Sequence, residues 1–377
     1  MLCFLKKSLL FCLLVTAIPA LWSAMTAHDD VFDERGVLQV DASGLKNTCV
    51  SPHLEAPITE GGNVFWCGTF QLAWNELRTL IGEDLRFAGK EPEMVAVLNK
   101  RQFLKSDLDD ASYVAVADFV RNDVHGRIQR ELQRKFGGRA SPKLLPSPAD
   151  TPRPQDIVAY SYLFKNLEFP VVFERIEQPI TFGTSRVACF GIGDVFKPGQ
   201  AAMYGQVRVL DFRSADDFII ELRTKSEGDR VILARTRPEQ TLRKTIVAVQ
   251  DRTLHGNPSP ACEGDVLKVP KFNFDITRSY QELLGAKLAV ANRGVAKDLQ
   301  VVAAAQNTRF QMDEKGVKLR SESHVSFGCG AEAPPPRKRV MVFDKPFLIV
   351  LQRSDAKTPY FALWVGNADL LRHADGN

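Results

Sequence analysis

The sequence predicts an α+β domain with large, mostly antiparallel sheets. Its 377 residues are 45% hydrophobic and 25% charged, which is ordinary for a chain that buries a sizeable core. Helical periodicity is clearest in the first half of the chain, whereas strand-like runs dominate the second half. We find no internal repeat, which argues against solenoids and propellers. A few early helices followed by many strands are typical of the α+β class.

Two early segments have the apolar spacing of amphipathic helices. In the first, steps of four, three and four place the apolar side chains on one face: Phe70, Trp74, Leu77 and Ile81. The second, residues 123–136, has apolar residues spaced by four: Val124, Ile128, Leu132 and Phe136. Glycine follows each segment and is expected to end the helix.

The later strands and their connections show equally plain patterns. Residues 205–212 alternate, and the apolar runs 218–222 and 231–234 flank a polar, glycine-containing pause, which predicts a hairpin. The proline-rich stretch 141–154 can form neither a helix nor a central strand. We expect it to be a domain linker or a long surface loop.

The N-terminus has the layout of a secretory signal peptide. Lys6 and Lys7 precede an apolar run, residues 9–21, and small residues follow. We expect cleavage after about residue 24 to 27, which leaves residues 28–377 as one exported, extracellular domain. No other apolar stretch is long enough to span a bilayer, so no membrane span is expected in the mature chain.

Cysteine usage suits an exported chain with one thiol left over. Removing the leader leaves five cysteines: Cys49, Cys67, Cys189, Cys262 and Cys329. At most two internal disulfides can form, and we predict that Cys329 is the free thiol because it alone lies in a loop-like stretch. The spacings contain no C-x-x-C, so no structural metal site is expected.

Motifs of catalysis and of cofactor binding are missing from the sequence. The net charge of +4 comes without a basic stripe, which argues against a nucleic-acid partner. There is no phosphate-binding glycine loop, no paired zinc histidines and no G-x-S-x-G. One nucleophile hypothesis pairs His324 with Cys329, but a hydrolase usually brings its base from elsewhere in the fold. We therefore expect neither an enzyme nor a bound cofactor.

Three segments near the C-terminus together resemble the serpin family. Residues 310–316, FQMDEKG, are similar to the segment that enters the serpin reactive loop. Residues 342–351, VFDKPFLIVL, resemble the strand that leaves it, and 357–361, KTPYF, the closing hairpin strand. Fainter similarity, such as 267–274, LKVPKFNF, extends the resemblance to about residues 60–370.

The resemblance implies a serpin-like domain whose exposed reactive loop spans about residues 317–341. Its hinge would be formed by five residues: Glu314, Gly316, Val317, Leu319 and Ser321. Two departures from the family bear on sheet opening. Tyr160 stands where the central strand usually has asparagine, and Leu363 stands where the last strand usually has glycine.

In serpins a protease that cleaves this loop is trapped when the loop inserts into the main sheet as a new strand. From Val317 onward the odd-numbered side chains are uncharged and the charges fall between them, so insertion would bury no charge. Inhibitory members, however, usually carry small residues where this chain has Val317 and Leu319. The expected function is a protease inhibitor, and the alternative is a non-inhibitory carrier, chaperone or binding protein.

The resemblance implies a serine or cysteine protease as partner and a monomeric inhibitor. Counting along the loop from either end places the scissile bond between Gly330 and Pro335. That candidate window contains Gly330, Ala331, Glu332, Ala333, Pro334 and Pro335. The triplet Arg337-Lys338-Arg339 just beyond it would suit a trypsin-like enzyme, unless it is merely a solvated part of the loop.

Overall fold

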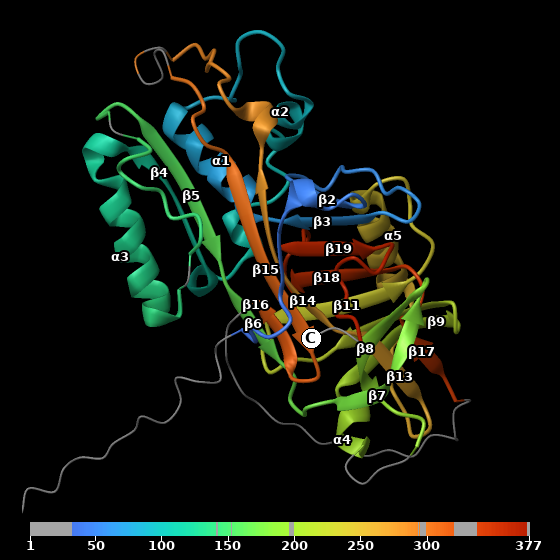
Figure 1. Cartoon of the computed structure of the whole chain (residues 1–377). Helices are drawn as coiled ribbons and strands as arrows, with labels where there is room; N and C mark the ends of the chain where they lie inside the picture. The colour runs from blue at the N-terminus through green and yellow to red at the C-terminus, as the bar shows by residue number, and fades with distance from the viewer. Residues whose placement is uncertain are drawn as a thin grey trace, which may run out of the picture. The chain divides into compact units, whose positions relative to one another are not determined.

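Four β-sheets organise the described residues of the chain (Figure 1). The structure is a computed structural model, and it describes residues 32–140, 142–151, 153–195, 200–292, 294, 299–319 and 338–374. All of these lie in one compact unit, Phe32–Asn377. Helices and antiparallel sheets occur together in it, so the α+β prediction is confirmed.

The first sheet has five strands in the order β1, β14, β15, β16, β6. Their bounds are Leu38–Asp41, Phe272–Ser279, Ala305–Asp313, Gly316–Leu319 and Lys165–Glu168, respectively. Strand β1 pairs in parallel with β14, and every other pairing in the sheet is antiparallel. The short strand β16 therefore lies between β15 and β6.

A two-stranded sheet of β4 (Tyr113–Phe119) and β5 (Ile157–Leu163) continues the line of β6. Only Phe164 separates β5 from β6, and Figure 1 shows one ribbon running from one strand into the other. Helix α3 (Val124–Phe136) covers one face of this pair. The apolar face predicted for residues 123–136 is buried there against Val116 of β4 and Val158 of β5, which confirms the predicted helix.

The largest sheet has eight strands in the order β12, β9, β10, β11, β18, β19, β3, β2. Their bounds are Ser259–Pro260, Val207–Ser214, Asp217–Leu222, Asp229–Arg235, Phe347–Arg353, Phe361–Val365, Asn63–Cys67 and Thr48–Ser51. Strands β10 and β11 pair as the predicted hairpin.

A four-stranded sheet holds the segment that follows the candidate reactive loop. Its order is β17, β13, β8, β7, with bounds Val340–Val342, Val266–Pro270, Ser185–Ile192 and Glu174–Phe182. Strand β17 is at the edge of this sheet, and among the described strands it pairs, in parallel, with β13 alone.

Helix α1 (Thr69–Ile81) lies against β4 and β5 and reaches β15. It ends at Gly82 in a left-handed conformation with φ of 89°, as the predicted stop requires. The other helices described are α2 (Glu93–Leu98), α4 (Gln200–Gly205) and α5 (Leu242–His255).

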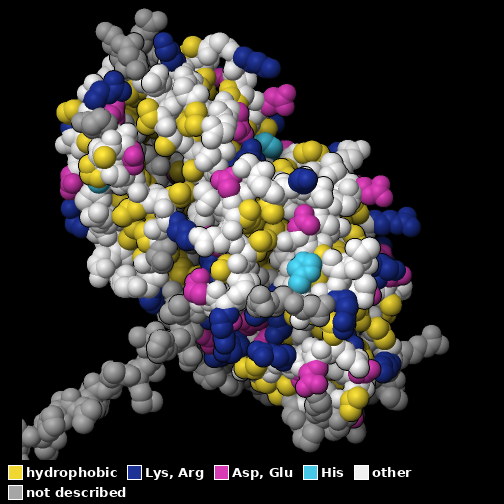
Figure 2. All heavy atoms as spheres, in the orientation of Figure 1, with side chains coloured by type: hydrophobic (Ala, Val, Ile, Leu, Met, Phe, Trp, Pro, Cys, Tyr) yellow, Lys and Arg dark blue, Asp and Glu magenta, His cyan; other side chains and the backbone are white. Residues whose placement is uncertain are grey.

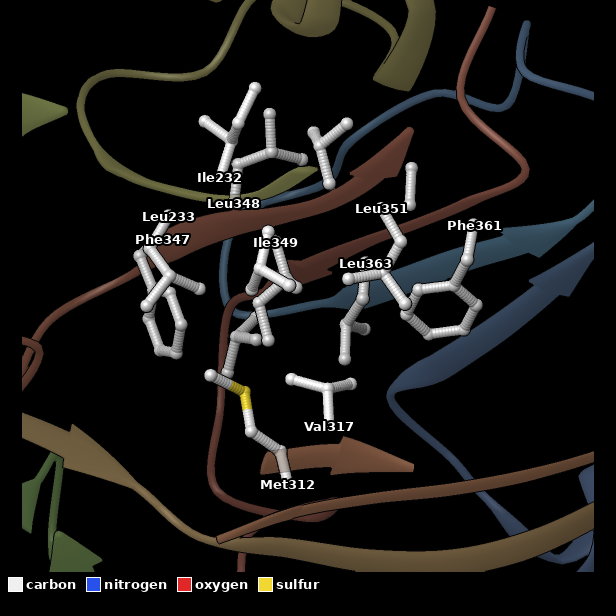
Figure 3. Close-up of a cluster of buried hydrophobic side chains, with 14 of the residues drawn as sticks. Ile232, Leu233, Met312, Val317, Phe347, Leu348, Ile349, Leu351, Phe361 and Leu363 are labelled. Carbon is white, nitrogen blue, oxygen red and sulfur yellow. The ribbon is translucent and has the colours of Figure 1, made fainter. Parts of the chain in front are cut away.

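The main core lies between the five-stranded and eight-stranded sheets. Figure 3 shows Met312 and Val317 directed toward the side chains of β18 and β19, among them Ile349 and Leu363. The ring of Phe310 on β15 stacks on that of Phe361 on β19, with centroids 4.7 Å apart. The inner faces of the two sheets thus pack together at the C-terminal half of β15.

The cysteines depart from the prediction. Cys49, Cys67, Cys189 and Cys262 are all free thiols. Cys67 and Cys189 are buried in separate strands as small apolar side chains, so the two disulfides allowed by the sequence are not formed among these four. Cys329 lies outside the described residues.

Two surface features complete the description. The described residues of the proline-rich stretch, 142–151 and 153–154, lie between α3 and β5 within the one compact unit, which favours a surface loop over a domain linker. Basic and acidic side chains are interspersed on the face shown in Figure 2. No helix in the described part of the chain is long and apolar enough to cross a membrane.

Candidate functional site

The turn from β15 into β16 is built around a buried carboxylate. Glu314 is only 7% exposed, and its carboxylate accepts hydrogen bonds from Lys271, between β13 and β14, and from Arg175 of β7. The Arg175 Nη2 to Glu314 Oε1 distance is 2.9 Å. Burial alone would raise the pKa of Glu314, but these two cations outweigh it and hold the pKa below its ordinary value. The turn is thus tied to two neighbouring strands.

Strand β16 is paired along both of its edges. Val317 lies opposite Met312 of β15 on one side and opposite Leu167 of β6 on the other. Gly316 permits this close approach, because a Cβ atom at position 316 would lie 2.5 Å from the carbonyl oxygen of Leu167. The first three residues of the reactive loop expected at 317–341 are therefore not in an exposed loop but in the centre of a sheet.

Val317 is the anchor of this short strand. Its side chain is fully buried and points into the core between the sheets (Figure 3). Lys318, the next residue, is partly exposed, as the period of two requires. Leu319 ends the strand with its backbone opposite Lys165. This places the apolar side of β16 inward and its charge outward.

Beyond the end of β16 the two flanking strands no longer share a partner. Residues 305–310 of β15 pair with β14 alone, and β5 pairs with β4 alone, among the strands that the structure describes. Side chains hold the two edges in relation to each other through the start of α1. Gln306 donates to the Thr69 hydroxyl at 2.8 Å, and Ser161 donates to the Thr69 carbonyl at 2.5 Å. We call the pair of edges, residues 305–310 and 157–163, the acceptor edges.

A buried ion cluster fixes β6 beside them. The side chain of Lys165 is 1% exposed and makes ion pairs with Asp109 and with Asp229, the latter at 3.0 Å. Its ammonium group also lies 5.4 Å from the ring centroid of Tyr360. The cluster joins β6 to β11, to the residue before β19 and to the chain before β4, so one edge of the site has a rigid support.

The C-terminal end of the candidate loop is held by a different device. Arg339 and Asp265 form an ion pair in which the guanidinium Nε and Nη2 both donate to Asp265 Oδ2, at 2.9 and 2.7 Å, and the carboxylate is 2% exposed. The same guanidinium donates to the Ser259 hydroxyl and to the Pro260 carbonyl. A guanidinium held in this way is not available to a protease, so Arg339 does not belong to the solvated triplet that the sequence suggested.

The structure brings part of the predicted site together. Glu314, Gly316 and Val317 form one turn and strand, as described above. Leu319 is described only by its backbone. The remaining predicted residues lie outside the described part of the chain: Ser321, Cys329, Gly330, Ala331, Glu332, Ala333, Pro334 and Pro335.

Sequence reasoning missed several residues that hold the site. Asp265 gave no signal, because it is a common charged residue without a motif around it. Lys165 ends the stretch 160–165 that resembles the family's central strand, but nothing in that pattern indicated its ion pairs. Lys271 stood inside a quoted motif, but nothing in the pattern indicated that it would bind Glu314. Among the described residues no group of three or more His, Cys, Asp and Glu side chains could hold a metal ion.

Comparison with solved structures returns serpins. Serpin48 of the insect Tenebrio molitor is 13% identical, with a TM-score of 0.43 over 82% of this chain and 92% of its own. Human thyroxine-binding globulin complexed with thyroxine is 11% identical, with a TM-score of 0.44 over 82% of this chain and 93% of its own. Mouse protein-Z dependent protease inhibitor is 13% identical, with a TM-score of 0.45 over 81% and 91%.

Serpin48 carries the family name that the sequence motifs resemble, and the other two are named as a thyroxine-binding globulin and a protease inhibitor. No family model and no curated protein sequence matches the chain. With so low an identity, the functional case rests on this chain's own residues.

Proposed function

We propose that this chain is an exported, serpin-like protease inhibitor and not an enzyme. A serine or cysteine protease would cleave the segment 320–337, and the released N-terminal part would extend β16 between the acceptor edges. The observation that carries the proposal is the double pairing of β16. Its four residues lie at the start of a central strand position. The flanking strands continue beyond Leu319, whereas the described part of this strand ends there.

The physical reason is the state of the acceptor edges. Each presents backbone amide and carbonyl groups with no strand partner among the described residues, and a strand added between them would satisfy both rows at once. Because β16 runs antiparallel to both neighbours, residues from 320 onward would continue in the same direction. The charged residues Arg320 and Glu322 would then fall on the same face as Lys318, away from the core.

Arg339 limits where the protease can cut. Since its guanidinium is occupied by Asp265, the scissile bond is expected to be N-terminal to it, in the window 330–335 or after Arg337 or Lys338. The first choice suits a protease that prefers small residues and the second a trypsin-like one.

A second function is favoured by one specific observation. Val317 is already fully buried in the uncut chain, and β16 is already paired on both sides. If β16 extends no further than Leu319 after cleavage, the chain would be a non-inhibitory carrier, chaperone or binding protein of the same fold.

The deciding experiment incubates the purified protein with a panel of serine and cysteine proteases. A covalent complex that survives boiling in detergent supports the inhibitor, and the same protease with its nucleophile replaced by alanine is the control that must give none. Clean cleavage by every protease, with no complex, supports the non-inhibitory alternative instead.

A further inference from the structure

The hydroxyl oxygen of Thr308, within the acceptor edge 305–310, has no hydrogen-bond partner among the described residues. Thr308 of β15 is 4% exposed, and its hydroxyl oxygen makes no hydrogen bond within the described part of the chain. Its neighbours on the same face of the strand are Gln306 and Phe310, both buried. A buried hydroxyl without a partner is unfavourable, and such groups are rare in folded proteins.

The polar residues around Thr308 already have their partners. Gln306 donates to the Cys67 carbonyl and to the Thr69 hydroxyl, and its carbonyl accepts from Tyr280. Ser161 on the opposite edge donates to Thr69. Thr308 therefore stands apart among the inward-facing polar side chains of the acceptor edges, because its hydroxyl alone lacks a partner there.

The observed register says which residue would face it. Met312 lies opposite Val317, and Gln311 lies opposite Lys318. Continuing this antiparallel pairing places position 321 opposite Thr308. On the other edge, the pair Leu167 and Val317 continues to place position 321 opposite Leu163, which is apolar. Position 321 would thus lie between a hydroxyl without a partner and a hydrocarbon side chain.

Ser321 is the residue that the chain has at this position. Directly opposed Cβ atoms in antiparallel strands are about 5 Å apart, a distance at which a serine and a threonine hydroxyl bond to each other. Ser323, the next inward-facing residue, would instead face Gln306 and Ser161, whose side chains already have hydrogen-bond partners. The two serines are therefore not equivalent.

We propose that Thr308 is a specificity-determining residue of the acceptor edges, and that it selects a hydroxyl at position 321 of the inserting segment. The occupant is the chain's own segment 320–327, so this inference rests on the proposed function. Ser321 would supply the partner that Thr308 lacks before insertion, and Ser323 would contribute no comparable bond.

The test compares the melting temperature before and after cleavage of the loop by a protease that cuts between residues 328 and 338. The variants are Thr308→Val, Ser321→Ala and the double variant, with Ser323→Ala as the matched control. In uncut protein Thr308→Val is expected to melt at the same temperature or slightly higher, since it removes an unpartnered hydroxyl. The rise on cleavage is expected to be smaller by roughly 1–2 °C in Thr308→Val and in Ser321→Ala, with no further loss in the double variant.

The outcomes separate this inference from the proposed function. If the wild-type protein gains stability on cleavage and both variants gain as much, the Thr308 inference is wrong and the strand insertion stands. If Thr308→Val lowers the melting temperature of the uncut protein, the hydroxyl already has a partner and the inference is also wrong. If no form gains stability on cleavage, the proposed insertion itself fails.

Discussion

The two ends of the candidate reactive loop are held in the fold by different interactions. At the N-terminal end, Gly316–Leu319 is a central strand with backbone pairing on both edges and a buried Val317. At the C-terminal end, Val340–Val342 is an edge strand paired on one side, and the buried pair of Arg339 and Asp265 secures it. Among the described strands, the first end has open strand edges ahead of it, along which β16 could be extended. The second end is held by one ion pair beside an edge strand.

This difference assigns a direction to any movement after cleavage. A strand that extends an existing ladder would advance between the acceptor edges, which have no strand partner on this side among the described residues. Releasing the other end would first separate a buried carboxylate from its guanidinium, which is costly. We therefore expect the N-terminal part to insert and the C-terminal part to stay on the four-stranded sheet.

The largest expected effect comes from cutting the loop itself. Cleavage between residues 328 and 338 should raise the melting temperature by roughly 10 °C, because about eight new backbone hydrogen bonds form, at about 1 kcal/mol each. Circular dichroism of the nicked and intact proteins measures the change. An unchanged or lower melting temperature would show that β16 cannot grow, and the asymmetry between the two ends would disappear.

Replacing the C-terminal anchor is expected to have the next largest effect. Arg339→Ala leaves the Asp265 carboxylate buried without its cation and should lower the free energy of unfolding by about 2–4 kcal/mol. The neighbouring Lys338 is exposed, so Lys338→Ala is the matched control and should change stability by less than about 0.5 kcal/mol. Denaturant unfolding checks both values. Equal effects of the two variants would mean that the ion pair does not hold this end.

The close contact between Gly316 and β6 at the N-terminal end of the loop can be tested by adding a single methyl group. Gly316→Ala forces a Cβ atom against the Leu167 carbonyl and should lower the free energy of unfolding by about 1–3 kcal/mol. Gly138→Ala meets open space and has no positive φ, so it should be close to neutral. Hydrogen exchange at the β16 amides should speed up in the first variant alone. Unchanged protection would show that β16 does not depend on close contact with β6.

The sequence predicted local features of the site better than its long-range partners. Of the alternation from Val317 onward, the structure describes the first two side chains, Val317 inward and Lys318 partly exposed, and this local feature follows because a period of two depends only on neighbouring residues. Helices α1 and α3 were found from their spacing for the same reason. The partnership of Lys165 with Asp109 and Asp229 could not be found, because it joins segments far apart in the chain.

Arg339 also shows that sequence patterns do not reveal long-range partners, because here the pattern suggested a role that the fold does not support. Its place in a run of three basic residues resembled protease bait, and only the fold shows that Asp265, distant in the sequence, neutralises it. A charged residue in a loop has the same local pattern whether it is solvated or buried in an ion pair. The four free cysteines show this too, since a count of cysteines does not say which of them lie side by side in the fold.

The smallest expected effect is a pH dependence at the hinge. Because the pKa of Glu314 is lowered in the folded state, this carboxylate adds stability above its ordinary pKa of 4.5, and the gain is lost as the pH falls through the lower folded value. Glu314→Gln should therefore be less stable than the wild type at pH 7, and the difference should shrink below about pH 4.5. Glu177→Gln, at an exposed position of β7, should keep the wild-type profile. Denaturant unfolding from pH 7 to pH 3 gives the three curves. If Glu314→Gln loses as much stability on acidification as the wild type does, the ion pairs of Glu314 with Lys271 and Arg175 are not what secures the hinge, and the N-terminal end would be held by backbone pairing and Val317 alone.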